Sequence, residues 1–181
     1  RPLGSSYPSP LAPRSIDTKR FSLGMSGEFR NGFDWDIHFT SSEDEGYISQ
    51  PDTSTQRFTS AIKGQGGEAG DQTWNIFDSS ANTSSLVDWI STKQETWTNN
   101  QLDVLDFVFS GDIKTNEFGN ISMAAGLQLR KEEFSVTRDK DSRIEFDANG
   151  NISKSADLLF LGGGIEASSK RDAMAAFAEF S

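Results

Sequence analysis

The chain alternates apolar and polar side chains through the stretch Gly119-Asn-Ile-Ser-Met-Ala-Ala-Gly-Leu-Gln-Leu-Arg-Lys-Glu-Glu133. Successive side chains of a strand point to opposite sides, so Ala125, Leu127 and Leu129 share one face and the intervening residues Gly126, Gln128 and Arg130 share the other. Such a strand has one apolar and one polar face. The pattern is typical of a transmembrane β-barrel strand, which has lipid on one side and a polar lumen on the other. A half-buried antiparallel strand of a water-soluble protein shows the same pattern.

The composition limits the classes of function. The 181 residues are enough for one domain with a core. Only 34% of them are hydrophobic, yet they include 14 Phe and 4 Trp, which favours strands over helical bundles. A net charge of −10 argues against a nucleic-acid partner, whose phosphates would be repelled. Cysteine is absent, which excludes disulfides and thiolate sites, and no apolar run reaches the roughly 18–20 residues of a membrane helix.

The first half of the chain predicts a hairpin followed by a long polar excursion. Residues 1–17 hold four of the five prolines and predict an irregular segment. Alternating runs over 19–29 and 33–40 flank Asn31-Gly32, a strong hairpin signal. Residues 41–101 are polar and predict a surface-loop excursion, with a short helix over 83–91 and a hairpin near 56–62.

The second half predicts further strands and completes the fold class. Alternating runs cover 102–113, 121–134 and 172–180, a turn is expected over 117–120, and 137–155 is a second polar stretch. We therefore predict an all-β antiparallel meander of at least six strands over 18–181. In this interpretation the meander is a partial transmembrane β-barrel with long polar extracellular loops and one short helix.

Motifs for catalysis or metal binding are weak, and we expect no catalytic, metal or cofactor site. Asp147-Ala-Asn-Gly-Asn151 has its Gly too early for a calcium loop and is better explained as an Asn-Gly turn. His38 is the only histidine and predicts a lumen-facing or surface residue. The acidic pair at 132–133 and the acidic run at 43–45 fit solvated charge better than a glycosidase acid and base.

Three loop tryptophans are the candidates for ligand contact, because flat rings stack on sugars and aromatic ligands. They are Trp74, Trp89 and Trp97. The alternative is that Trp89 anchors the small helix and that the other two pack the loop.

Several segments, in order, resemble the barrel domain of TonB-dependent outer-membrane receptors. They are Ser26-Gly-Glu-Phe-Arg-Asn-Gly-Phe-Asp-Trp-Asp36, Trp74-Asn-Ile-Phe-Asp78, Ser110-Gly-Asp112, Ala124-Ala-Gly-Leu-Gln-Leu-Arg-Lys-Glu132 and Ala175-Ala-Phe-Ala-Glu-Phe180. The likeness spans nearly the whole chain, although each piece alone is weakly specific. The family's plug domain, its energy-coupling motif and its terminal aromatic residue have no counterpart in these residues. The resemblance therefore implies a middle portion of the barrel.

The resemblance also implies a location, partners and residue roles. The chain would lie in a bacterial outer membrane and contact the lipid bilayer, the plug domain and the remaining barrel strands. It would couple to an energy-transducing TonB-type protein through the plug, for uptake of a small-molecule, glycan or peptide ligand. Lipid would meet Phe21, Leu23, Met25, Leu105, Phe107, Phe109, Leu127 and Leu129. The lumen would meet Glu28, Asp106, Asp112, Gln128, Arg130 and Glu179.

A soluble β-rich binding module, possibly one that binds carbohydrate, is the competing hypothesis. In a β-sandwich the apolar face of each strand packs on a second sheet, so the same alternation needs no lipid. The two hypotheses differ in what covers the apolar face.

Overall fold

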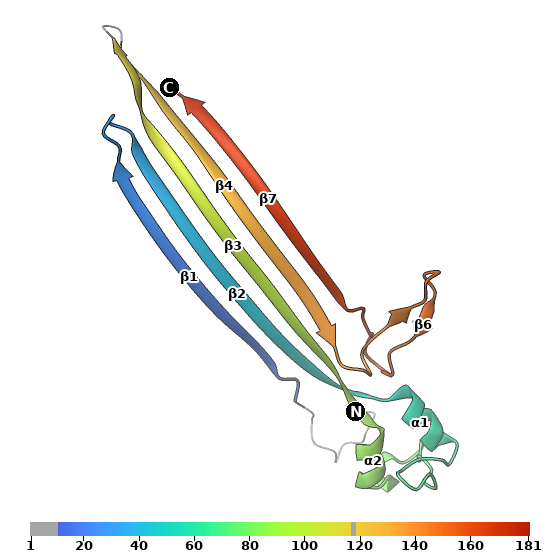
Figure 1. The fold of residues 1–181 in the computed structure, drawn as a ribbon. Coiled ribbons are helices and arrows are strands. Elements are labelled where there is room, and N and C mark those ends of the chain that lie inside the picture. The colour runs from blue at the N-terminus through green and yellow to red at the C-terminus, as the bar shows by residue number, and fades with distance from the viewer. Residues whose placement is uncertain (1–10, 117–118) are drawn as a thin grey trace. The chain divides into compact units, whose positions relative to one another are not determined.

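The computed structural model describes residues 11–116 and 119–181, and its main feature is a five-stranded antiparallel meander. The strands lie in the order β1-β2-β3-β4-β7 (Figure 1). Their bounds are Arg14–Glu28 for β1, Asp34–Thr53 for β2, Ser91–Asn116 for β3, Gly119–Arg138 for β4 and Ala167–Phe180 for β7. The predicted antiparallel meander is confirmed. The sheet is open, because β1 and β7 are its edge strands.

Shorter elements lie in two of the connections between the long strands. Helices α1 (Thr55–Ile62) and α2 (Ser84–Ile90), with a 3₁₀ turn at Ser79–Ala81, connect β2 to β3. Strands β5 (Glu145–Phe146) and β6 (Ile152–Lys154) form a separate antiparallel pair between β4 and β7. Within 11–116 and 119–181, neither helix has the length and apolar character needed to cross a membrane.

The contacts divide the chain into two compact units, which we describe separately. The sheet unit consists of Ile16–Glu45, Thr98–Ser135 and Ser168–Ser181. The loop unit consists of Gly46–Trp97 and Val136–Ala167, together with the described residues before Ile16.

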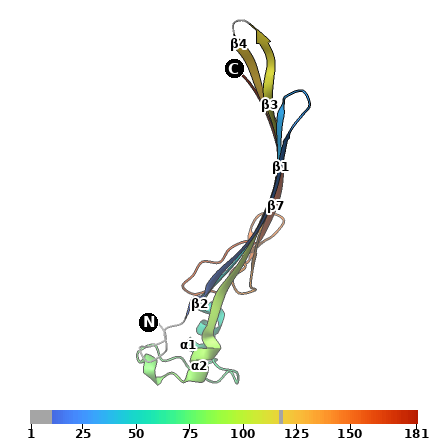
Figure 2. The ribbon, with the colours of Figure 1, turned by 90° about the vertical axis from the view of Figure 1, so that its left-hand side faces the viewer.

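In the sheet unit the strands form a single layer (Figure 2). The β1–β2 hairpin forms where Asn31-Gly32 predicts it, but its loop has three residues, 30–32, between the paired Phe29 and Phe33. Gly32 has a positive φ of 81°, which a glycine adopts without strain. The predicted turn at 117–120 falls partly outside the described residues, because the structure does not describe 117 and 118.

The loop unit has a small core built around its two helices. The side chain of Ser54 caps α1 by accepting from the Arg57 N–H, and Thr83 caps α2 by accepting from the Leu86 N–H. The helices bury Ala61, Trp74, Leu86, Val87 and Ile90, against which Phe58 and Trp89 pack. These few side chains are the main apolar cluster of the loop unit, so each of them matters to its stability.

Two carboxylates, the buried Asp52 and the half-buried Asp157, hold the second connection against the first within the loop unit. Asp52 is 8% exposed and accepts from the backbone N–H groups of Phe160 and Leu161. Asp157 accepts from the Ser54 hydroxyl at 2.5 Å and from the Gln56 N–H at 2.8 Å. These bonds link the residues before and within α1 to residues more than a hundred positions later.

Asp139 organises the turn that follows β4. It accepts hydrogen bonds from the backbone N–H groups of Glu95 and Asp141, at 2.9 and 2.8 Å, and from the Ser142 hydroxyl. Burial acts to raise the pKa of the Asp139 carboxyl, but these hydrogen bonds outweigh burial and hold its pKa below the usual range.

Acidification is therefore expected to weaken the loop unit through Asp139. A depressed folded-state pKa contributes stability above the unfolded value near 3.9, and this stability is lost as the pH falls through the folded value. We expect Asp139→Asn to lower the free energy of unfolding by about 1–3 kcal/mol at pH 7. The variant should also lose less of its stability than the wild type as the pH falls from about 5 to about 3. Urea titrations followed by tryptophan fluorescence check this. The exposed Asp71→Asn is the control, and equal acid sensitivity in wild type and Asp139→Asn would contradict the assignment.

Four sequence predictions differ from the structure. The hairpin expected near 56–62 is wrong, because these residues form α1, whose Ser54 cap and buried Ala61 fit a helix. The structure has two α-helices where the sequence predicted one. The excursion over 41–101 is shorter than expected, since β2 continues to Thr53 and β3 begins at Ser91. Strand β1 begins at Arg14, inside the segment expected to be irregular.

The turn predicted at Asp147–Asn151 is confirmed. The Asp147 carboxylate accepts from the N–H groups of Asn149 and Asn151, and Gly150 has a φ of 82°. The carboxylate of Asp147 therefore accepts its hydrogen bonds from within the turn.

Candidate functional site

Hydrogen bonds and ring contacts define which residues share a face of the sheet unit. Between β1 and β2, Thr18 donates to Asp44 at 2.6 Å and the hydroxyls of Ser22 and Thr40 lie 2.9 Å apart. Even-numbered residues of these strands therefore lie together. The rings of Phe21 and Phe39 are 6.4 Å apart, and these odd-numbered residues lie on the opposite face.

The same two faces continue across the other strands. Odd-numbered residues of β2 and β3 meet, as in the pair Phe33 and Phe109, whose rings are 6.2 Å apart. Even-numbered residues of β3 and β4 meet where Gln128 donates to Asp106 at 2.7 Å. Between β4 and β7, odd-numbered residues of β4 meet even-numbered residues of β7, as Glu133 meets Lys170 at 2.8 Å. The even-numbered residues of β7 therefore lie on the same face as the odd-numbered residues of the other strands.

One face of the sheet unit is apolar and uncovered; we call it the apolar face. Its large side chains are between 37% and 76% exposed. They include Phe21, Leu23, Met25, Phe29, Ile37, Phe39, Leu105, Ile113, Ile121, Leu127, Leu129, Met174 and Phe180. Exposed apolar area of this extent is typical of a protein–protein or membrane interaction surface.

The apolar segments overlap across the sheet, and those of the neighbouring strands β3 and β4 are in register. They span Phe21–Phe29 in and beside β1, Leu105–Ile113 in β3 and Ile121–Leu129 in β4, nine residues each. The Phe21–Phe39 and Phe33–Phe109 contacts and the Gln128–Asp106 bond place these segments side by side. A transmembrane β-strand needs about 9–11 residues, so the apolar face has the height of a bilayer core.

A charged border ends the apolar face on the side away from the β1–β2 turn. It consists of Lys19, Glu43, Glu45, Asp103, Lys131, Glu133, Lys170 and Asp172. Lys19 lies 3.8 Å from Glu43, and Glu133 contacts both Lys131 at 3.1 Å and Lys170 at 2.8 Å. Sequence reasoning missed this border. The signal was present, because Lys131 and Glu133 continue the odd-numbered series of Leu127 and Leu129.

The opposite face is polar and carries the residues expected to face a lumen. They are Glu28, Asp106, Asp112, Gln128, Arg130 and Glu179, and the eight residues expected to face lipid all lie on the apolar face. Asp112 accepts from the Ser122 hydroxyl at 2.6 Å, as Asp106 does from Gln128. The separation into two faces agrees with the sequence pattern, while contact with a lumen or lipid stays a prediction.

Phe177 is an exception on the polar face. A Cβ atom added at Gly126 would clash with its ring, so the ring lies directly over this glycine. The missing side chain makes room for the phenyl group, a known way of covering a glycine in a sheet. His38 covers Gly24 in the same manner and lies 3.9 Å from Asp36.

Two of the three tryptophans share the core of the loop unit, and the third lies elsewhere in that unit. Trp74 is 6% exposed in the core, and its ring meets that of Phe58 edge-on at 5.7 Å. A ring so enclosed offers little area to a ligand, which favours the packing alternative for Trp74. Trp89 packs against the same core, and Trp97 contacts Tyr47 with ring centroids 5.5 Å apart.

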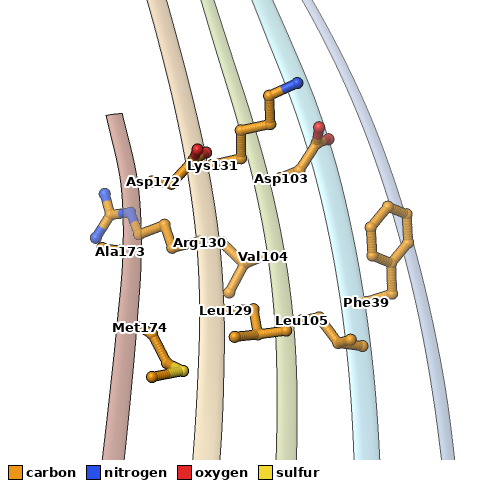
Figure 3. A pocket seen from close by; sticks show the side chains of 10 residues that line it. All are labelled: Phe39, Asp103, Val104, Leu105, Leu129, Arg130, Lys131, Asp172, Ala173 and Met174. Carbon is orange, nitrogen blue, oxygen red and sulfur yellow. The ribbon is translucent and has the colours of Figure 1, made fainter. Parts of the chain in front are cut away.

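An open groove lies where the apolar face meets the charged border (Figure 3). Its volume is about 420 Å³. Phe39, Leu105, Leu129 and Met174 form its apolar part, and Asp103, Lys131 and Asp172 form a charged row beside it. Its lining residues come from four neighbouring strands.

Comparisons with known proteins and a search for metal-binding groups were both negative. The sequence matches no family model, and neither the search of curated proteins nor that of solved structures gave a significant match. Within 11–116 and 119–181, no three or more acidic or histidine side chains are grouped so as to hold a metal ion.

Proposed function

We propose that this chain is part of the wall of a transmembrane β-barrel in a bacterial outer membrane. The apolar face contacts lipid and the polar face lines the lumen. The observation that carries the proposal is the overlap of the nine-residue apolar segments across the sheet, which forms a band about as tall as a bilayer core, with a charged border at one side.

The lengths of the connections agree with this orientation. In an antiparallel meander the β1–β2 and β3–β4 connections lie at one end, and these have only a few residues. The alternate connections, β2–β3 and β4–β7, are long and contain the helices and the β5–β6 pair. Outer-membrane barrels combine short periplasmic turns with longer extracellular loops.

The two exposed edges of the sheet are evidence that additional strands pair with it. β1 and β7 each present unpaired backbone groups, which the hydrocarbon region of a membrane does not tolerate. The proposal therefore requires further strands to pair with both edges. The apolar face of a soluble sandwich would need a second sheet over it, and none of the described residues provides one.

The class of barrel rests on the sequence resemblance to TonB-dependent receptors. The chain would supply wall and vestibule for an active transporter, in which the long loops and a plug bind a ligand and an inner-membrane partner supplies the energy. The expected result is uptake of a labelled iron chelate, vitamin, glycan or peptide that needs this protein and stops when a protonophore is added. Uptake that persists without energy would exclude active transport.

Detergent dependence tests the membrane proposal. We expect the native particle that contains this chain to require detergent and to exceed 19.9 kDa, as measured by light scattering with and without detergent. A detergent-free monodisperse particle of 19.9 kDa would contradict the proposal and favour the soluble module.

A further inference from the structure

The two edge strands of the sheet run in the same direction. Strand direction reverses at every step of an antiparallel meander, so β1 and β7, the first and fifth strands in the sheet, are parallel to each other. In Figure 1 the arrowheads of β1 and β7 point the same way and that of β4 points the opposite way. A strand that is antiparallel to one edge is therefore also antiparallel to the other.

Hydrogen bonds show which backbone groups are free at the β7 edge. Ser122 and Ser181 each donate to the carbonyl of the other, at 3.0 and 3.1 Å, and Phe177 faces Gly126 in the same register. Odd-numbered residues of β7 therefore point their N–H and C=O groups towards β4, and even-numbered residues such as Ala176 point theirs to the free edge. These even-numbered residues lie on the apolar face.

The free backbone groups of β1 belong to residues of the polar face. Phe29 donates to the Phe33 carbonyl at 2.7 Å, and Ser22 lies opposite Thr40 in the same register. Odd-numbered residues of β1 thus bond to β2, and even-numbered ones such as Ser26 present free N–H and C=O groups. A strand that bonds to β7 through its apolar-face residues offers its polar-face residues at its other edge, which is the arrangement that β1 needs.

We propose that the wall closes through an odd number of additional strands with a sequence different from this chain, and that no second copy of this chain pairs with either edge. This inference rests on the proposed function. An odd number keeps every pair of strands antiparallel and, added to the five strands here, gives the even total of bacterial single-chain barrels. Small barrels have about eight strands, so at least about three more are needed.

Identical copies do not fit these edges within one membrane. In a ring of copies β7 would meet β1 of the next copy, and these two strands run parallel. Pairing of β7 with β7, or of β1 with β1, is antiparallel only if the second copy is inverted. An inverted copy would place its long connections on the opposite side of the bilayer, whereas outer-membrane barrels keep their long loops on one side.

Crosslinking in the native particle tests what occupies the edges. The chain has no cysteine, so single thiols can be placed along β1 at 20, 22 and 26 and along β7 at 174, 176 and 178. Tagged and untagged copies are produced together in every combination and treated with a thiol crosslinker of about 10 Å, roughly two strand spacings. We expect no crosslink between a tagged and an untagged copy. Ser22→Cys with Thr40→Cys in one chain is the positive control, since these side chains meet.

Two neighbouring alanines test the backbone pairing at the β7 edge. Ala175→Pro removes an N–H that bonds to β4, and Ala176→Pro removes one that faces the edge. We expect both variants to lower the yield of folded particle about tenfold or more, because the additional strand uses the Ala176 N–H. A normal yield for Ala176→Pro beside a reduced yield for Ala175→Pro would show an unoccupied edge and overturn the inference.

A crosslink that joins two copies at either edge would also overturn the inference, while a detergent requirement of the same particle would leave the membrane proposal standing. The proposed function has a different failure. A particle of 19.9 kDa that stays dispersed without detergent would contradict the membrane proposal itself.

Discussion

Arginine in place of Ala125 is expected to destabilise the membrane-inserted chain by about 2–4 kcal/mol. Ala125 lies midway along the apolar segment Ile121–Leu129 and on the same face as Leu127. In the proposed orientation its side chain points into the hydrocarbon core, where a guanidinium loses its hydration without gaining a partner. Urea titration of the chain in lipid vesicles, followed by tryptophan fluorescence, measures the loss.

The neighbouring alanine provides a matched control. Ala124 is on the same strand and has the same side chain, but it lies on the polar face. Ala124→Arg is expected to change the free energy of unfolding by less than about 1 kcal/mol, since a lumen accommodates a charge. Similar losses for the two variants would show that both faces meet the same environment.

Truncation of Ile90 is expected to lower the stability of the loop unit by about 2–5 kcal/mol. The Ile90 side chain is fully buried, in a cluster that contains only four other buried residues. Ile90→Ala removes its methyl and methylene groups and leaves a cavity that so small a core cannot refill. The change in tryptophan fluorescence on urea denaturation, to which the core residue Trp74 contributes, reports the effect.

Ile76→Ala is the matched control for this truncation, because Ile76 belongs to the same unit and is 63% exposed. The free energy of unfolding of the Ile76→Ala variant should stay within about 0.5 kcal/mol of the wild-type value. Equal effects at Ile76 and Ile90 would mean that the cluster is not the core of this unit.

The sheet could be predicted well from the sequence where the two faces differ in polarity. The alternation over Ile121–Leu129 and Leu105–Ile113 predicts strands, and the Asn31-Gly32 signal marks the first hairpin. A pattern with period two predicts which residues share a face. Asp106 and Gln128 were expected on the same face, and the structure shows them hydrogen-bonded there.

The full lengths of β2 and β3 could not be predicted from the sequence, because parts of both strands are polar on both faces. Residues 41–53 of β2 and 91–101 of β3 lack the alternation, and backbone pairing with neighbours extends them. Local sequence does not reveal such pairing. The helix α1 was missed for a related reason, since its eight residues include Thr and Phe, which also favour strands.

The charged border and the groove depend on register between strands. Asp103, Lys131 and Asp172 are far apart in the sequence, and only the pairing of β3 with β4 and of β4 with β7 brings them into one row. The sign of each charge is visible in the sequence. Their alternation across the sheet follows from the three-dimensional pairing alone.

A cysteine scan along β4 tests the central claim most directly, and the absence of native cysteine makes each introduced label unique. Fluorophores would be placed one at a time from 121 to 133 in the chain inserted into lipid vesicles. We predict that a lipid-phase quencher reaches the odd-numbered positions from 121 to 129, that an aqueous quencher reaches the even-numbered ones, and that lipid-phase quenching ends at 131. Aqueous quenching at the odd-numbered positions, or no alternation between neighbours, would contradict a lipid-facing sheet.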